Sequence, residues 1–107
     1  MREVDRKTEW ALRMYFQWEG MPWMEGEAKR LCDRVAWALT KVKPGKKYKD
    51  FIELRYKEGV TIERLAEIYQ VEPGAIQKKK RGLVRALAPL VWPDDEVKRI
   101  AKGIKEV

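Results

Sequence analysis

Apolar residues recur along this chain at intervals of three and four positions, and no long segment alternates between apolar and polar residues. The first spacing is typical of amphipathic helices and the second of strands. The pattern therefore predicts an all-α fold, a small helical bundle of about six helices. Because no long linker or internal repeat interrupts the chain, we expect a single helical domain over residues 1–107. It divides into an N-terminal helical region (1–45), a central region (46–90) and a C-terminal amphipathic helix (91–107).

The first half of the chain predicts three helices. The first is expected over residues 7–18, and a Gly-Met-Pro sequence that favours a turn follows it. The second carries an apolar stripe from residue 28 to residue 42 and ends before Pro44. A third helix is expected over residues 48–59, with a lysine-rich lead-in and a glycine at its end.

The second half predicts two helices separated by a short turn, and then a final helix. Thr61 suits an N-cap, because its hydroxyl oxygen can accept a hydrogen bond from a backbone N–H in the first turn of a helix over residues 62–68. The next helix is expected from Pro73 to about Leu87, since proline fits a first helical turn. Pro89 should end or kink it. An acidic start and an apolar stripe predict the last helix over residues 93–107.

The helix that begins at Pro73 has two chemically different faces. With successive residues about 100° apart, an apolar face separates cleanly from a basic one, and only Lys80 falls on the apolar side. The residues of the polar face are Gly74, Lys78, Arg81 and Arg85, with Gln77 on its flank. Two short helices of which the second is basic are the parts of a helix-turn-helix, whose second helix enters the major groove of DNA. We expect Gln77 and Lys78 near base edges, and Arg81 or Arg85 against phosphates.

The segment from Asp50 to Leu87 resembles the helix-turn-helix of sigma-factor region four, the part that reads promoter −35 elements. The matching pieces are the lead-in LRYKEG, the first helix TIERLAEIY, and the turn and recognition helix VEPGAIQKKKRG. The resemblance implies that the DNA-facing residues are Pro73, Gly74, Gln77, Lys78 and Arg81. It also implies that the two helices are held together by Leu65, Ala66, Val71 and Ile76. In size, the chain is similar to phage and prophage late-gene transcriptional regulators of the ArpU and RinA kind.

Two positions depart from the sigma-like pattern. Gln70 stands at the turn, where this family usually has a glycine that supplies a left-handed backbone conformation. Gly82 lies inside the recognition helix, where it should cost about 1 kcal/mol relative to alanine. These departures put the geometry of the turn and the end of the helix in question.

Charge adds a second candidate surface. The 24 Lys and Arg residues exceed the 17 Asp and Glu residues, giving a net charge of +7. The excess lies in residues 29–49, with eight basic and one acidic residue, and in residues 76–91, with five basic and none acidic. Such blocks mark places where an anionic partner can dock. We therefore include Lys46 and Lys47 as candidate contacts to the DNA backbone, the other interpretation being a solvated loop.

The composition excludes several kinds of chemistry. The chain has no His, no Ser and no Asn, which removes serine nucleophiles, histidine bases and histidine metal ligands. A single cysteine, Cys32, allows neither an internal disulfide nor a cysteine zinc site and is expected to be a buried thiol. The Gly45-Lys46-Lys47 triplet lacks the upstream glycine and the following serine or threonine of a phosphate-binding P-loop. We expect no enzymatic activity, no metal and no cofactor.

Tryptophans gather near the start of the chain. Trp10, Met14 and Trp18 follow the i, i+4, i+8 spacing of one helix face. This favours a core or protein-contact stripe over a platform on which bases stack.

These patterns together favour a sequence-specific double-stranded DNA-binding protein, a small transcriptional regulator. A lone helix-turn-helix makes few base contacts, so a homo-oligomer or a partner such as RNA polymerase or a sigma factor is expected. Two alternatives stay open: a phage small-terminase-like protein that recognises a packaging site, and a protein-binding module that contacts RNA polymerase or a sigma or anti-sigma factor. No apolar run reaches the length of a membrane span, so a soluble, cytoplasmic protein is expected.

Overall fold

A computed structural model of the chain describes residues 2–18 and 26–92, and within these ranges every regular element is helical. The elements, in chain order, are α1 (Glu3–Trp18), α2 (Glu27–Lys41), the 3-10 turn η1 (Lys46–Tyr48), the π-helical segment η2 (Glu53–Lys57), α3 (Ile62–Tyr69) and α4 (Pro73–Val91). The all-α prediction is confirmed for this part of the chain. The predicted last helix, over residues 93–107, lies outside the described residues. No helix in the ranges described has the length and apolar character needed to cross a membrane.

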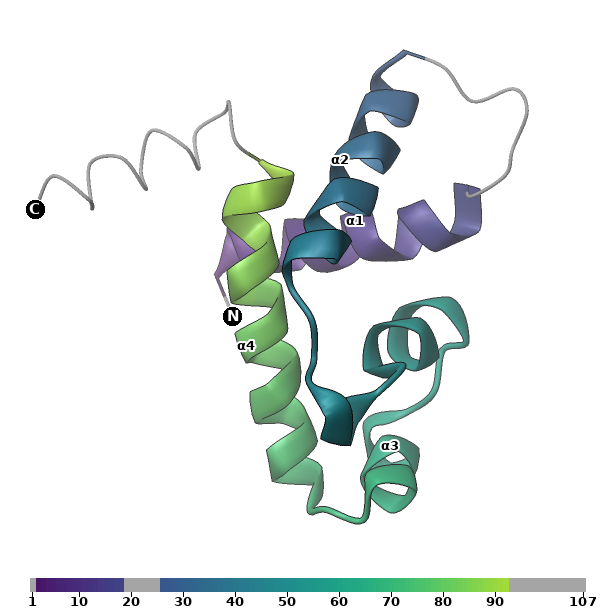
Figure 1. Ribbon diagram of the computed structural model, residues 1–107, viewed down its shortest axis with the longest axis vertical. Helices are drawn as coiled ribbons and strands as arrows, with labels where there is room; N and C mark the ends of the chain where they lie inside the picture. Colours follow the sequence, from purple (N-terminus) through teal and green to yellow (C-terminus); the bar gives the residue numbers. More distant parts are fainter. Residues whose placement is uncertain (1, 19–25, 93–107) are drawn as a thin grey trace, which may run out of the picture.

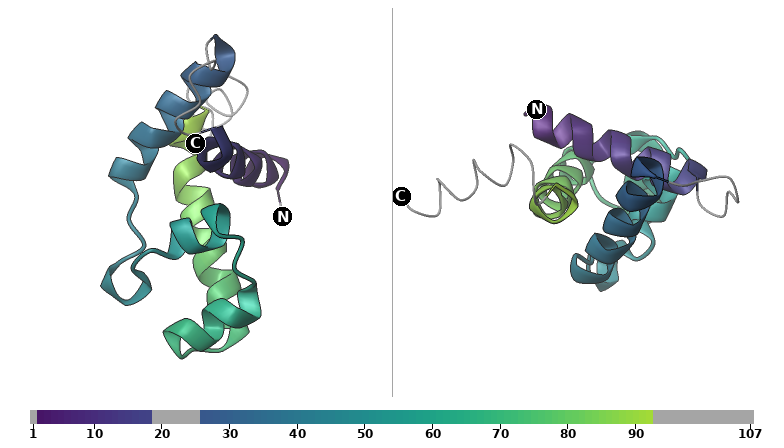
Figure 2. Two further views of the ribbon diagram at one scale, coloured as in Figure 1. Left: turned by 90° about the vertical axis from the view of Figure 1, so that its right-hand side faces the viewer. Right: turned by 90° about the horizontal axis from the view of Figure 1, so that it is seen from above.

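Helix α4 is the element on which the others assemble. In Figure 1, α1 and α2 pack against its C-terminal half, and α3 lies beside its N-terminal end. The η2 segment fills the space between α1 and α3. The two views of Figure 2 show the same arrangement from the side and from above. One end of α4 is therefore enclosed by helices, and the other is left with a broad open side.

The core takes apolar side chains from every α-helix and from the segment that leads into η2. The largest fully buried apolar residues are Phe51, Leu12, Leu65, Ile76, Leu87, Val35 and Val84. Burying a side chain of this size stabilises the fold by roughly 1.5–3 kcal/mol. The predicted apolar face of α4 is confirmed, because Ile76, Leu83 and Leu87 are all buried. Cys32 is buried in α2, as expected.

Helices α1 and α4 are longer than predicted. The first helix begins at Glu3, four residues before the predicted start, because Glu3 and Asp5 place negative charge in its first turn. The prediction that α4 ends near Leu87 is wrong, since the helix passes through Pro89 to Val91. An internal proline costs about 3 kcal/mol. Burial of the last turn offsets that cost, and the Arg34 Nε donates a hydrogen bond of 2.7 Å to the Leu90 carbonyl.

The predicted helix over residues 48–59 is not regular. Asp50 has a left-handed backbone with φ of 64°, which separates η1 from the helical residues that follow. Aspartate tolerates this conformation better than most residues. The Glu58 N–H then donates to the Glu53 carbonyl at 3.0 Å, an i to i+5 hydrogen bond that widens the helix into a π-turn.

The turn between α3 and α4 resolves the question raised by Gln70. Gln70 adopts the left-handed conformation, with φ 57° and ψ 49°. The Val71 N–H donates to the Ala66 carbonyl at 3.0 Å, and the Gln70 N–H to the Glu67 carbonyl at 3.2 Å. This is the pair of bonds that closes a helix in a Schellman motif. Glutamine therefore holds the conformation that a glycine commonly supplies at such a turn.

The start of α3 is also as predicted. The Arg64 N–H donates to the Thr61 hydroxyl oxygen at 3.1 Å, which makes Thr61 the N-cap. The short helix between this cap and the left-handed Gln70 is thus closed at both ends by local hydrogen bonds.

Two glycine substitutions should change stability in opposite directions. A methyl group at Gly82 would meet no atom within 4 Å, so Gly82→Ala should stabilise the protein by about 1 kcal/mol through helix propensity. Gly59 also has open space around it, but its φ is +70°, so Gly59→Ala should destabilise by about 1–2 kcal/mol. Urea unfolding of both variants measures the difference. A destabilised Gly82→Ala protein would show that α4 is not regular at this residue.

Candidate nucleic-acid interface

The polar face of α4 is open to solvent along the N-terminal half of the helix. The predicted site residues that are exposed there are Pro73, Gly74, Gln77, Lys78 and Arg81, and Arg85 is exposed one turn further along the helix. Within the ranges that the structure describes, the side chains of Gln77, Lys78 and Arg81 form no hydrogen bond or ion pair. Their polar groups are therefore available to an external partner.

Lys80 is the one basic residue of α4 that points inward, and a buried carboxylate explains its position. Its Nζ lies 3.5 Å from Glu9 Oε2 of α1, and the exposed fractions of the two side chains are 12% and 6%. The Tyr56 hydroxyl donates a hydrogen bond of 2.7 Å to the same oxygen. Burial raises the pKa of Tyr56 well above its usual value, and the hydrogen bond to Glu9 raises it further. The lysine that broke the face pattern is thus part of the interior.

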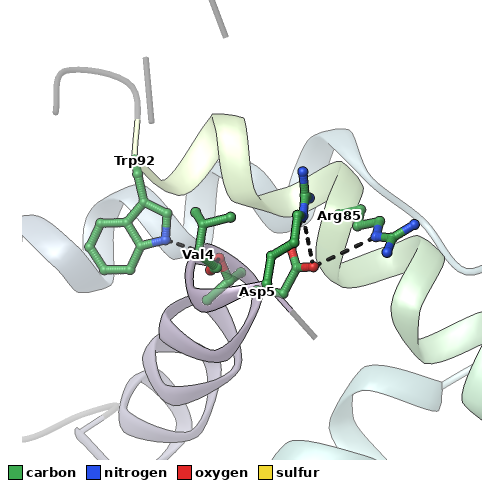
Figure 3. Close-up of polar contacts among 6 residues, drawn as sticks. Val4, Asp5, Arg85 and Trp92 are labelled. Carbon is green, nitrogen blue, oxygen red and sulfur yellow. Dashed lines mark hydrogen bonds and ion pairs between the residues drawn. The ribbon is translucent and has the colours of Figure 1, made fainter. Parts of the chain in front are cut away.

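Arg85 is exposed but is shared with α1. Its Nε lies 3.6 Å from Asp5 Oδ2, and Figure 3 shows the guanidinium directed toward that carboxylate. Arg2 donates two hydrogen bonds to Asp5, of 2.9 and 3.1 Å. Burial alone would raise the pKa of Asp5, but the hydrogen bond to Arg2 and the charges of Arg2 and Arg85 outweigh it and lower the pKa. Arg85 therefore has a structural role that the sequence did not indicate.

The contact between α1 and α4 continues to the end of α4. The Trp92 indole N–H donates to the Thr8 hydroxyl at 3.0 Å, and that hydroxyl donates to the Val4 carbonyl at 2.7 Å (Figure 3). The Lys7 ammonium also lies 4.4 Å from the Trp92 ring centroid. These contacts fix the C-terminal half of α4 and leave its N-terminal half to carry the open polar face.

The second basic block lies beside the same half of α4. Lys46 and Lys47 are exposed on η1, and the segment that carries them runs alongside the helix (Figure 2, left). A groove of about 470 Å³ separates the two. It is lined by Val42, Lys43 and Tyr48 from the segment, and by Ala75, Lys78, Lys79, Gly82, Leu83 and Ala86 from α4. The fold thus brings together two basic blocks that are about 30 residues apart in the sequence.

Three groove residues were missed as candidates, namely Lys43, Lys79 and Tyr48. The Lys79 and Lys47 ammonium groups lie 5.1 and 5.8 Å from the Tyr48 ring centroid. That ring packs edge-on against Phe51 and Tyr69, at centroid distances of 6.0 and 5.2 Å. Lys43 belongs to the basic block, so charge was an available signal for it. No sequence signal indicated that Lys79 of α4 would lie over the Tyr48 ring.

The tryptophan stripe on α1 is not a core element. Trp10 is 46% exposed, and its ring packs edge-on against Trp18 at 6.3 Å. Trp37 of α2 is 41% exposed as well. The prediction that this stripe lies in the core is wrong for Trp10, because the buried face of α1 is the one that carries Asp5, Thr8 and Leu12. That the stripe contacts another protein stays a prediction.

Comparison of the chain with protein-family models, with curated proteins and with solved structures finds no match. The resemblance to sigma-factor region four therefore rests on the residues of the segment from Asp50 to Leu87 alone.

Two neighbouring lysines of α4 should respond differently to substitution. Lys80→Ala leaves Glu9 buried without its cation, and such a change destabilises a protein by about 3 kcal/mol. Lys78→Ala removes an exposed, unpaired side chain and should change stability by less than about 0.5 kcal/mol. Thermal or urea unfolding compares the two variants. Equal effects would mean that the Glu9–Lys80 pair does not hold α1 against α4.

Asp5 should make the protein sensitive to acid. Its pKa is lower in the folded protein than in the unfolded chain, so its ionised form stabilises the fold above the unfolded pKa of about 3.9. That contribution is lost as the pH falls through the lower, folded pKa. Asp5→Asn should lower stability at neutral pH by about 1–3 kcal/mol, and should also reduce the further loss on acidification. If stability declines equally with acid in both proteins, Asp5 does not carry this effect.

Proposed function

We propose that this protein is a sequence-specific double-stranded DNA-binding protein, a small transcriptional regulator that places the N-terminal half of α4 in the major groove. The observation that carries the proposal is the open face of α4, on which Gln77, Lys78 and Arg81 are exposed and unpaired within the described residues. A buried or internally paired face would have no free groups for recognition.

The elements around that face support a helix-turn-helix interpretation. Helix α3 is short and capped, residues 70–72 form a tight turn, and α4 begins at Pro73. The left-handed Gln70 provides the backbone conformation that this turn needs. In a helix-turn-helix the first helix crosses the DNA backbone while the second enters the groove. Here α3 would take the first position and α4 the second, as the sigma-like resemblance implies.

The side chains of the open face suit different parts of DNA. The Gln77 amide can bind adenine through two hydrogen bonds, and the Lys78 ammonium can donate to guanine acceptors. Each such contact discriminates against a wrong base by roughly 1–3 kcal/mol. Arg81 lies one turn after Gln77 and suits a phosphate at the edge of the groove. Arg85 would contribute less than predicted, because Asp5 already lies close to its guanidinium.

A protein partner or a second copy is part of the proposal. The few base contacts of one recognition helix give limited specificity, so a homo-oligomer or a complex with RNA polymerase or a sigma factor would add affinity. The exposed Trp10 and Trp37 favour a protein contact on the α1–α2 side of the fold. The mass of the protein in solution distinguishes a regulator from a packaging protein, because the latter would assemble into a ring of many subunits.

Substitution of the recognition residues should weaken binding while the fold is retained. Duplexes selected from a random pool at about 150 mM salt should contain a common motif. A Lys78→Ala/Arg81→Ala protein should bind that motif at least 10-fold more weakly, in line with the loss of about 1–3 kcal/mol for a single specific contact. Fluorescence anisotropy with a labelled duplex measures the affinity.

A matched control removes the same charge elsewhere. Lys29→Ala/Arg30→Ala also deletes one lysine and one arginine, at the start of α2 and at the opposite end of the molecule from the turn before α4 (Figure 1). It should bind within about 3-fold of the unaltered protein. If the pool yields no motif, sequence-specific recognition is wrong. A protein partner retained by the Lys78→Ala/Arg81→Ala protein would then favour the protein-binding alternative.

A further inference from the structure

The groove between η1 and α4 has the features of an anion-binding site. Three lysines line it, and none of its lining residues is acidic. The lysines come from both basic blocks, Lys43 from one and Lys78 and Lys79 from the other. Like charges that gather around open space repel one another, and a bound anion removes that repulsion.

Small residues keep the groove open. Ala75, Gly82 and Ala86 line its α4 side. A larger apolar side chain at any of these positions would fill the space and close the segment onto the helix. Tyr48 holds the other side in place through its contacts with Phe51 and Tyr69. The Tyr69 hydroxyl also donates to the Lys49 carbonyl at 2.6 Å, which fixes the end of the lysine segment to α3.

The groove also borders the open face of α4. Lys78 belongs to both, because it lines the groove and is exposed next to Gln77. With about 100° between successive residues, Gln77 and Arg81 lie on one side of Lys78, and Lys79 and Gly82 lie on the other. A polymer that contacts Gln77 and Arg81 would therefore extend past Lys78 to the lysine segment.

We propose that residues 43–49 bind the phosphodiester backbone of one strand of the duplex that α4 reads. This inference rests on the proposed function. The major groove is about 12 Å wide and has a phosphate backbone along each edge. With α4 in the groove, the lysine segment on its flank stands over one of those edges. Lys43 supplies charge from the groove and Lys46 supplies it from the exposed surface of η1, while Lys79 lines the groove from the helix side.

The salt dependence of binding tests this inference. Each phosphate that a protein contacts contributes about −0.9 to the slope of log K against log salt concentration. Lys43→Gln/Lys46→Gln should therefore make the slope shallower by about 1.8 while the selected motif stays the same. Both residues are exposed, so the thermal midpoint should not change. Lys29→Gln/Arg30→Gln is the control with the same loss of charge, and its slope should match that of the unaltered protein.

Phosphate ethylation gives a second measurement that does not depend on affinity. Ethyl groups should interfere with the unaltered protein along both edges of the major groove, and with the Lys43→Gln/Lys46→Gln protein along one edge only. Suppose that the unaltered protein binds its motif but the salt slope of the Lys43→Gln/Lys46→Gln protein is unchanged, or changes only as much as that of the control. The inference would then be overturned. If the unaltered protein binds no duplex, the proposed function itself fails.

Discussion

Two buried carboxylates of α1 determine how the rest of the structure is arranged. Asp5 and Glu9 lie one turn apart on α1, and each faces a cation of α4, Arg85 and Lys80 respectively. An ionised carboxylate that is buried without a cation costs several kcal/mol. Helix α1 therefore has one favourable position along α4, in which both carboxylates are paired. These contacts also fix the rotation of α4 about its own axis.

That rotation decides which residues of α4 remain outside. Once Lys80, Leu83 and Leu87 are turned toward the other helices, the 3.6-residue repeat directs Gln77 and Arg81 toward solvent. The pairs with α1 lie at Lys80 and Arg85, on the side of the helix that faces α1, and no carboxylate lines the groove on its flank. The same helix is therefore a core element on one face and a polar, positively charged surface on another. This division fits a protein that works by binding.

Local patterns in the sequence were sufficient to predict much of the fold. The apolar stripe of α2, the Thr61 cap and the start of α4 at Pro73 all depend on residues within one or two turns of each other. The failures depend on distant contacts instead. Asp50 takes its left-handed conformation within a segment that packs against α3, and α4 continues past Pro89 because its last turn is buried.

The candidate site was also predicted only in part, because some of its features follow from local patterns and others from distant contacts. Helical periodicity indicated that Gln77, Lys78 and Arg81 share an exposed face, and all three are exposed. Periodicity could not show that Arg85 lies near Asp5, or that Lys43 lines a groove with Lys79, because these pairs are far apart in the chain.

The central claim, that the N-terminal half of α4 contacts duplex DNA, is tested most directly by amide NMR during titration with a random-sequence duplex at about 50 mM salt. The account predicts that the largest changes in amide chemical shift occur in residues 74–82 and 43–49. Changes confined to α1 and α2, or no changes at all, would contradict it.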